Sequence, residues 1–209
     1  MLRPNFILAI LIALSFLFDR AQAVFGLRPG MFRGEVIGYA SVLEDEAIRI
    51  NQNNKPFVEN PTRQAQLGEG FYMVSRPGIW RGIEGAWYCA VRANTEKMKG
   101  IDKIYIPEYY RAVPSNKRQR LYSQGEDVIM EYLASEDLLT PGEALRFGPI
   151  LGSHSQLQML IPTTVINDDK LSLWAKCFKS EFELREYTNE EIDWQHREDW
   201  EIKGIPVPE

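Results

Sequence analysis

The chain has 209 residues, of which 44% are hydrophobic, and its 29 acidic and 24 basic side chains give a net charge of −5. This length and apolar content suit one ordinary hydrophobic core rather than two. The negative balance argues against a protein that binds nucleic acid through its phosphates, because such binding needs a concentrated positive face.

The first 23 residues have the pattern of a secretory signal peptide. Arg3 provides a positive start, residues 6–18 form an apolar run, and residues 21–23 (Ala-Gln-Ala) match the small-x-small pattern before a cleavage site. The apolar run is too short to span a bilayer comfortably, and no later stretch is apolar enough to do so. We therefore expect a secreted protein, cleaved before Val24, without a membrane span.

The two cysteines indicate a disulfide. Cys89 and Cys177 lie in strand-like runs, 87–91 and 173–178, and an exported pair is most simply oxidised. A reactive thiol or a metal ligand is the alternative. Because the chain has only two histidines and no His/Cys cluster, we expect no metal site.

The remaining pattern alternates strands and helices. Residues 34–40 predict a strand, and a Ser-x-x-Glu capping box at 41–44 predicts a helix that continues to about Asn51. Residues 51–61, rich in Asn and Pro, predict an exposed loop. Further elements are strands at 71–75, 87–92, 103–106, 145–147, 156–161 and 173–178, a short helical piece from Asn94 and an amphipathic helix at 126–133.

Two charged segments lie outside these elements. The basic stretch 117–120 is expected to be a solvated loop, and the alternative is a dibasic processing site at Lys117-Arg118, which chain breakage after Arg118 would reveal. The C-terminal segment, residues 181–209, is strongly acidic but contains Trp194 and Trp200. We expect it to pack across a domain formed by residues 24–180, with its charged side in water.

A glycine corner stands at the centre of the chain. Gly68 and Gly70 allow positive φ and a close approach of a ligand, and the strand that follows holds Tyr72 as a stacking platform with a polar hydroxyl. A purely structural turn is the alternative. Arg76 and Arg81 follow this strand and could reach a pyrophosphate, or they are exposed loop residues.

Three short motifs, in this order, resemble the mono-ADP-ribosyltransferase family, and the secreted fungal members and their toxin relatives most of all. The motifs are Gly38-Tyr39-Ala40 before a helix, Gly68-Glu69-Gly70-Phe71-Tyr72 on a strand, and Gln156-Leu157-Gln158 entering a late strand. The resemblance implies an α+β fold, an ADP-ribosyltransferase-like split β-sandwich with flanking helices, which clamps NAD between two small bent sheets.

The resemblance also implies roles for these residues. Gly38, Tyr39, Ala40, Gly68, Gly70, Phe71 and Tyr72 would bind NAD as a substrate, and Tyr72, Gln156 and Gln158 would occupy catalytic positions. In the family the first motif ends in His or Arg, which anchors a ribose or phosphate. A Glu in the late strand bonds the nicotinamide ribose, and its fixed charge stabilises the cation that forms as the C–N bond breaks.

The chain departs from the family at its polar positions. Ala40 cannot donate a hydrogen bond, and Gln156 and Gln158 have no charge where arginine-modifying members carry Glu-x-Glu. We therefore expect a toxin or effector that is weakly active or catalytically silent and that acts on a protein of a host or a competitor. The alternative is an active NAD-dependent mono-ADP-ribosyltransferase or NAD glycohydrolase.

Overall fold

The structure is a computed structural model that describes residues 34–206, apart from 61–64, 81, 83 and 113–114. All described residues belong to one unit that begins at Gly34. The predicted signal peptide, residues 1–23, lies outside the described residues. Among the helices that are described, none has the length and apolar character needed to cross a membrane.

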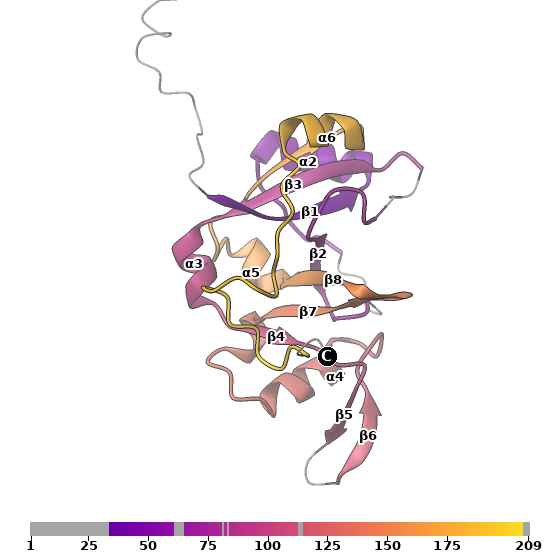
Figure 1. Cartoon of the computed structure of the whole chain (residues 1–209), viewed down its shortest axis with the longest axis vertical. Helices are drawn as coiled ribbons and strands as arrows, with labels where there is room; N and C mark the ends of the chain where they lie inside the picture. Colours follow the sequence, from indigo (N-terminus) through magenta and orange to yellow (C-terminus); the bar gives the residue numbers. More distant parts are fainter. Residues whose placement is uncertain (1–33, 61–64, 81, 83, 113–114, 207–209) are drawn as a thin grey trace, which may run out of the picture. The chain divides into compact units, whose positions relative to one another are not determined.

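Seven strands form the main sheet, in the order β4-β7-β8-β2-β1-β3-β9 (Figure 1). They are β1 (Glu35–Val42), β2 (Gly70–Val74), β3 (Trp87–Ala93), β4 (Lys103–Tyr105), β7 (Leu145–Ile150), β8 (Ser153–Pro162) and β9 (Trp174–Phe178). Strands β4 and β7 are parallel, and the other neighbours are antiparallel. Strands β5 (Tyr109–Ala112) and β6 (Lys117–Arg120) form a separate hairpin.

Five α-helices and one short 3-10 helix accompany the strands in the described part of the chain. They are α2 (Glu44–Asn53), α3 (Thr95–Gly100), α4 (Glu126–Ala134), α5 (Thr163–Asn167), α6 (Glu181–Tyr187) and the 3-10 helix η1 (Pro141–Glu143). Together with the sheet they make an α+β fold, which confirms the coarse prediction of the fold class.

The main sheet is narrowest where β1 meets β2. These strands share one register pair, Tyr39 with Val74, whereas β1 pairs with β3 along nearly its whole length. The sheet therefore consists of two parts, β4-β7-β8-β2 and β1-β3-β9, joined at a junction that we call the seam. Two separate sheets were expected, but the hydrogen bonds at the seam make one continuous sheet.

The predicted disulfide is confirmed. Cys89 of β3 and Cys177 of β9 are bonded, and they lie directly opposite each other in the strand pair. Asn51 of α2 donates to the Cys177 carbonyl and accepts from the Cys177 amide, at 2.9 and 2.8 Å. The helix is thus tied to the edge strand that the disulfide holds.

Alternation along the strands divides the buried side chains between two clusters. Phe71 and Met73 of β2 point into the larger cluster, and Tyr72 between them packs against a smaller cluster that contains Leu67 and Leu160. Successive side chains on a strand face opposite sides of the sheet, so one short strand serves both clusters.

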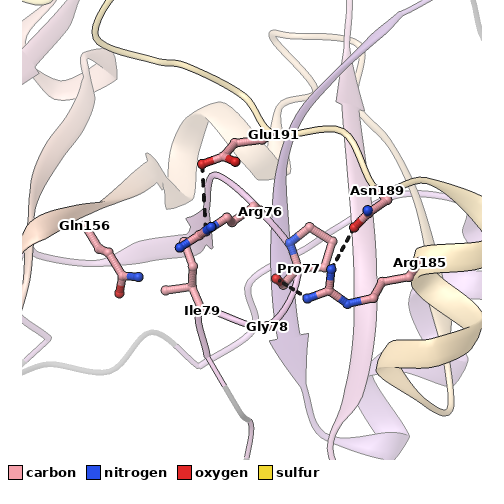
Figure 2. A pocket seen from close by; sticks show the side chains of 8 residues that line it. All are labelled: Arg76, Pro77, Gly78, Ile79, Gln156, Arg185, Asn189 and Glu191. Carbon is pink, nitrogen blue, oxygen red and sulfur yellow. Dashed lines mark hydrogen bonds and ion pairs between the residues drawn. The ribbon is translucent and has the colours of Figure 1, made fainter.

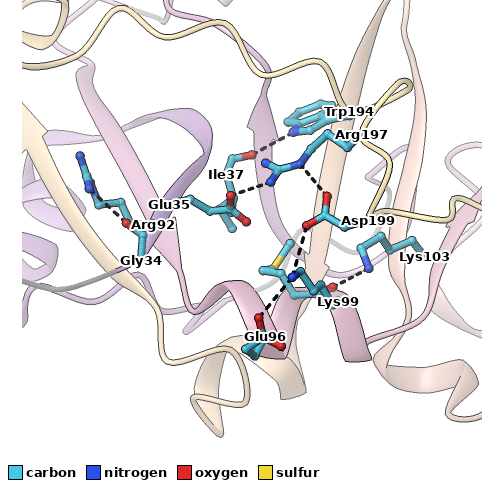
Figure 3. A network of polar contacts seen from close by, with 11 residues as sticks. Gly34, Glu35, Ile37, Arg92, Glu96, Lys99, Lys103, Trp194, Arg197 and Asp199 are labelled. Atoms are coloured by element: carbon cyan, nitrogen blue, oxygen red, sulfur yellow. Dashed lines mark hydrogen bonds and ion pairs between the residues drawn. The ribbon is translucent and has the colours of Figure 1, made fainter.

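The acidic C-terminal segment that begins at residue 181, which we call the tail, packs across the unit through its apolar residues. Trp194 and Trp200 are buried, and the Trp194 indole N–H donates to the Ile37 carbonyl at 2.9 Å. Arg197 lies 2.6 Å from Glu35 and 3.5 Å from Asp199. Figure 3 shows these ion pairs beside the Trp194 contact. The tail is therefore an integral layer of the fold.

Two local predictions were wrong. The capping box at 41–44 does not form, because β1 continues through Val42 and Leu43 takes the N-cap position without a side-chain bond. Three acidic residues in the first turn, Glu44, Asp45 and Glu46, complement the helix dipole instead. The expected basic loop 117–120 is strand β6, whose side chains alternate against β5.

Candidate functional site

The glycine corner is held by hydrogen bonds within the protein. The Tyr72 hydroxyl accepts from the Leu67 amide at 2.8 Å and donates to the Gly68 carbonyl at 2.9 Å. Burial raises the pKa of Tyr72 well above its ordinary value. The hydroxyl expected to serve as a polar handle for a ligand is therefore already used to close the turn.

An ion pair between a buried arginine and a half-buried glutamate lies directly behind this corner. Arg146, whose side chain is fully buried, donates to Glu126 at 2.6 and 2.8 Å and to the Leu67 carbonyl at 3.0 Å. Glu126 also accepts from the Glu69 amide at 2.7 Å. Burial alone would raise the pKa of Glu126, but the hydrogen bond and charge of Arg146 outweigh it and hold that pKa below its usual value.

Protein atoms fill the space on the Cβ side of both glycines, although Gly70 and Tyr72 also line a separate open cavity of about 560 Å³. Gly68 has a φ of +97°, and an added Cβ would lie 2.2 Å from an Arg146 nitrogen. At Gly70 an added Cβ would lie 2.2 Å from the Ile161 carbonyl oxygen of β8. The glycines are needed for close packing inside the protein, which favours the structural turn over the ligand-binding interpretation.

The first motif lies inside the seam. The Tyr39 side chain is buried, and its hydroxyl donates to the Glu190 carbonyl at 2.8 Å and contacts the Thr188 hydroxyl at 3.3 Å. Gly38 packs against Met73 of β2. Ala40 is only 5% exposed. The tail thus covers the aromatic residue of this motif.

The space beside Ala40 is almost filled. A cavity of about 10 Å³ remains there, lined among others by Ala40, Trp80, Tyr88 and Leu184. Ligand pockets in proteins commonly hold roughly 300–1,000 Å³. The residues at the seam do not fit NAD, because the space is too small and Ala40 offers no donor.

The two late glutamines occupy different environments. Gln158 is buried, and its amide donates to the Gln66 side chain at 2.7 Å and to the Pro149 carbonyl at 3.3 Å. Gln156 is half-buried and lines two adjoining cavities of about 560 and 440 Å³. The structure therefore separates the predicted site residues: Tyr72 lies against another cavity, Ala40 beside the filled seam, and Gln156 in an open groove.

We call the two adjoining cavities the Gln156 groove. Both are lined by Arg76, Ile79, Gln156 and Glu191, so segments from the end of β2, the start of β8 and the tail meet there (Figure 2). Arg76 lies 3.8 Å from Glu191, and both side chains are largely exposed. Such an ion pair contributes little, about 0–1 kcal/mol, so Arg76 can exchange Glu191 for an anionic ligand.

The tail supplies most of the groove's remaining polar groups. Arg185 donates to Glu181, Asn189 and the Pro77 carbonyl, which fixes it on one wall. In the cavity of about 440 Å³, His196 Nδ1 lies 2.9 Å from Asp193 Oδ2. Slight burial would raise the pKa of Asp193, but hydrogen bonds from His196 lower it.

The sequence singled out two of the groove residues, Arg76 and Gln156, for separate reasons, and it gave no signal for the tail residues. The two tryptophans indicated that the tail would pack, but not which polar side chains would then face Gln156. Arg81 lies outside the described residues. Among the residues that the structure does describe, no group of three or more His, Cys, Asp or Glu could hold a metal ion.

Comparison with known proteins identifies a family for this chain. A family model described as a family of unknown function, DUF5910, matches residues 65–205. The match includes the glycine corner and every residue of the Gln156 groove, and it begins after the Gly38-Tyr39-Ala40 motif. No curated protein and no solved structure matches the chain.

Proposed function

This chain belongs to the DUF5910 family, and we propose that it is a secreted, ADP-ribosyltransferase-like effector without transferase chemistry that acts by binding a protein of a host or a competitor. The alternative is an active NAD-dependent mono-ADP-ribosyltransferase or NAD glycohydrolase.

The arrangement of strands supports the resemblance. The three motifs lie on β1, β2 and β8, and these strands are consecutive in the sheet although they are far apart in the sequence. The near division of the sheet at the seam also suits a fold built from two small sheets. Ancestry in that family accounts for the order of the motifs.

The closed seam is the observation that carries the proposal of a silent protein. Trp80 and the tail fill the space that a dinucleotide would need beside Ala40, and Tyr39, Tyr72 and Gln158 use their polar atoms in internal bonds. The lack of a carboxylate at Gln156 and Gln158 removes one electrostatic contribution, a loss that commonly lowers a rate by roughly 10²–10³.

The test measures NAD binding by calorimetry and nicotinamide release with and without a lysate as acceptor. We expect neither saturable binding at millimolar NAD nor release above the buffer rate. Trp80→Ala opens the seam, and NAD binding gained only by this variant would support closure as the cause of silence.

Gln156→Ala tests the enzymatic alternative, since the half-buried Gln156 side chain lines an open groove. Gln52→Ala, an exposed glutamine on α2, is the matched control. Saturable NAD binding by the unmodified protein, with nicotinamide release that Gln156→Ala abolishes and Gln52→Ala preserves, would overturn the proposal in favour of an active enzyme.

A further inference from the structure

The β5–β6 hairpin presents a row of cations that the Gln156 groove does not use. Arg111 lies directly opposite Arg118, and Tyr109 lies opposite Arg120, so these four side chains share one face, which we call the arginine face. All four are exposed. The other face points inward, where the Tyr110 ring contacts the Tyr132 ring of α4 at 5.1 Å.

The arginine face concentrates positive charge on an acidic protein. Residues 109–120 contain four cations and no carboxylate, whereas the whole chain has a net charge of −5. Arg111 and Arg118 are like charges in directly opposite positions, an arrangement that destabilises a strand pair. An anion bound between them would remove this repulsion.

Little within the protein offsets this charge. Arg118 lies over the Tyr109 ring at 3.9 Å, and Arg120 lies 3.4 Å from Glu108. Among the described residues, neither Arg111 nor Arg118 forms an ion pair. Their guanidinium groups remain open to a partner from outside.

Strand β6 also has an open edge. The Leu121 amide donates to the Glu108 carbonyl at 2.9 Å, so these two residues form a hydrogen-bonded pair. Since such pairs alternate along an antiparallel ladder, the backbone groups of Arg118 and Arg120 point away from β5. Within the described part of the chain β6 pairs with β5 alone, so an extended peptide can add to this edge.

We propose that the arginine face and the β6 edge together bind an extended acidic segment of a partner protein, with carboxylates at alternate positions. Alternate side chains of a strand are about 6.7 Å apart, which is also the spacing of Arg118 and Arg120 along β6. Guanidinium groups bind carboxylates through two parallel hydrogen bonds. The inference rests on the proposed binding role and gives the chemistry of the partner.

The test uses the full chain and a fluorescent peptide in which Glu alternates with Thr, followed by anisotropy. The comparison peptide has the same composition with its glutamates adjacent. We expect the alternating peptide to bind more tightly, and Arg118→Gln to weaken its binding roughly tenfold, because a hydrogen bond to a charged group is lost. Arg118→Lys keeps the charge but cannot form two parallel hydrogen bonds, so its affinity should lie between those of Arg118→Gln and the unmodified protein.

Lys117→Gln is the matched control, since it removes the same charge from the same strand but on the opposite face. Circular dichroism checks that each variant is folded. An equal loss in Lys117→Gln, or equal binding of both peptides, would overturn the proposal because either result indicates diffuse charge attraction.

Two further outcomes would overturn the acidic-peptide proposal, because each assigns the arginine face to another binding partner. One is binding of phosphatidylserine vesicles that Arg118→Gln abolishes. The other is concentration-dependent self-association that the same variant abolishes. None of these assays contains NAD, so failure here leaves the test of the proposed function unaffected, and nicotinamide release would overturn that function without changing the peptide result.

Discussion

Gly68 combines a backbone requirement with a packing requirement. Its φ of +97° is a conformation that residues with a Cβ rarely adopt, and the added Cβ of alanine would also lie 2.2 Å from Arg146 and 2.3 Å from Glu126. We expect Gly68→Ala to lower the free energy of unfolding by about 3 kcal/mol, because it strains the turn and displaces the buried Arg146 guanidinium from Glu126. Urea unfolding measures this loss.

Gly85→Ala is the control for Gly68. Gly85 has a φ of +80°, but no atom lies within 4 Å of the position of an added Cβ. This substitution therefore tests backbone strain without a clash. If the two variants lost the same free energy, the packing of the corner against Arg146 and Glu126 would have no measurable role.

The residue scale also shows what the sequence could not specify about the predicted site residues. Gly68, Gly70 and Tyr72 were correctly identified as a tight corner before a strand. Their contacts, however, come from Glu126 and Arg146, and Gln158 is bonded to Gln66 far away in the sequence. A motif specifies a local conformation, whereas the fold determines whether its polar atoms face a ligand or another residue.

At the scale of elements, the C-terminus of α3 is capped by a buried lysine. Lys103 is 3% exposed, and its ammonium donates to the Met98 carbonyl at 2.5 Å and the Ile101 carbonyl at 3.0 Å. Burial lowers the pKa of Lys103 to about 8. Between about pH 8 and pH 10.5 the unfolded chain binds a proton that the folded protein has released, so stability rises with pH in this window.

We expect the free energy of unfolding to increase by about 1 kcal/mol from pH 7 to pH 9 through this lysine, and Lys103→Met to lose that increase. Lys99→Met, at an exposed lysine of α3, should keep the increase. Thermal or urea unfolding of the three proteins at both pH values gives the comparison. A rise of the same size in Lys103→Met would show that this lysine is not its source.

Strands and helices were predicted well where apolar residues alternate or recur with a clear helical period. The strands around Cys89 and Cys177, the helix starting at 126 and the strand ending at Pro162 appear close to their expected places. The prediction failed at 117–120 because charge suggested a loop, although a two-stranded hairpin can expose one face completely. It also failed at Ser41, where pairing with Tyr88 continues the strand past the capping pattern.

At the scale of the whole molecule, the tail joins the two parts of the sheet. Trp194 donates to Ile37 of β1 and contacts the Phe147 ring of β7 at 5.6 Å between centroids. The same segment covers Tyr39 and forms one wall of the Gln156 groove. The sequence predicted that the tail would pack, but only the fold shows that it closes the seam.

Substitutions at Trp194 separate the contribution of its hydrogen bond to Ile37 from that of its ring packing. Trp194→Phe keeps a ring against Phe147 but leaves the buried Ile37 carbonyl without its donor, so we expect a loss of about 1–3 kcal/mol in the free energy of unfolding. Trp194→Ala also removes the ring and should cost about 3–5 kcal/mol. Phe182→Ala, at an aromatic residue of α6 that is 72% exposed, should change stability by less than about 0.5 kcal/mol.

Limited trypsin digestion determines whether the loss is local to the tail. If Trp194 anchors this segment, Trp194→Ala will be cleaved at Arg197 faster than the unmodified protein under conditions where the rest of the chain stays intact, since cleavage needs the segment to detach from the protein. Trp194→Phe should be intermediate. Equal cleavage of all three proteins would mean that the tail is held mainly by other contacts, such as the Arg197–Glu35 ion pair, and that the seam is closed independently of Trp194.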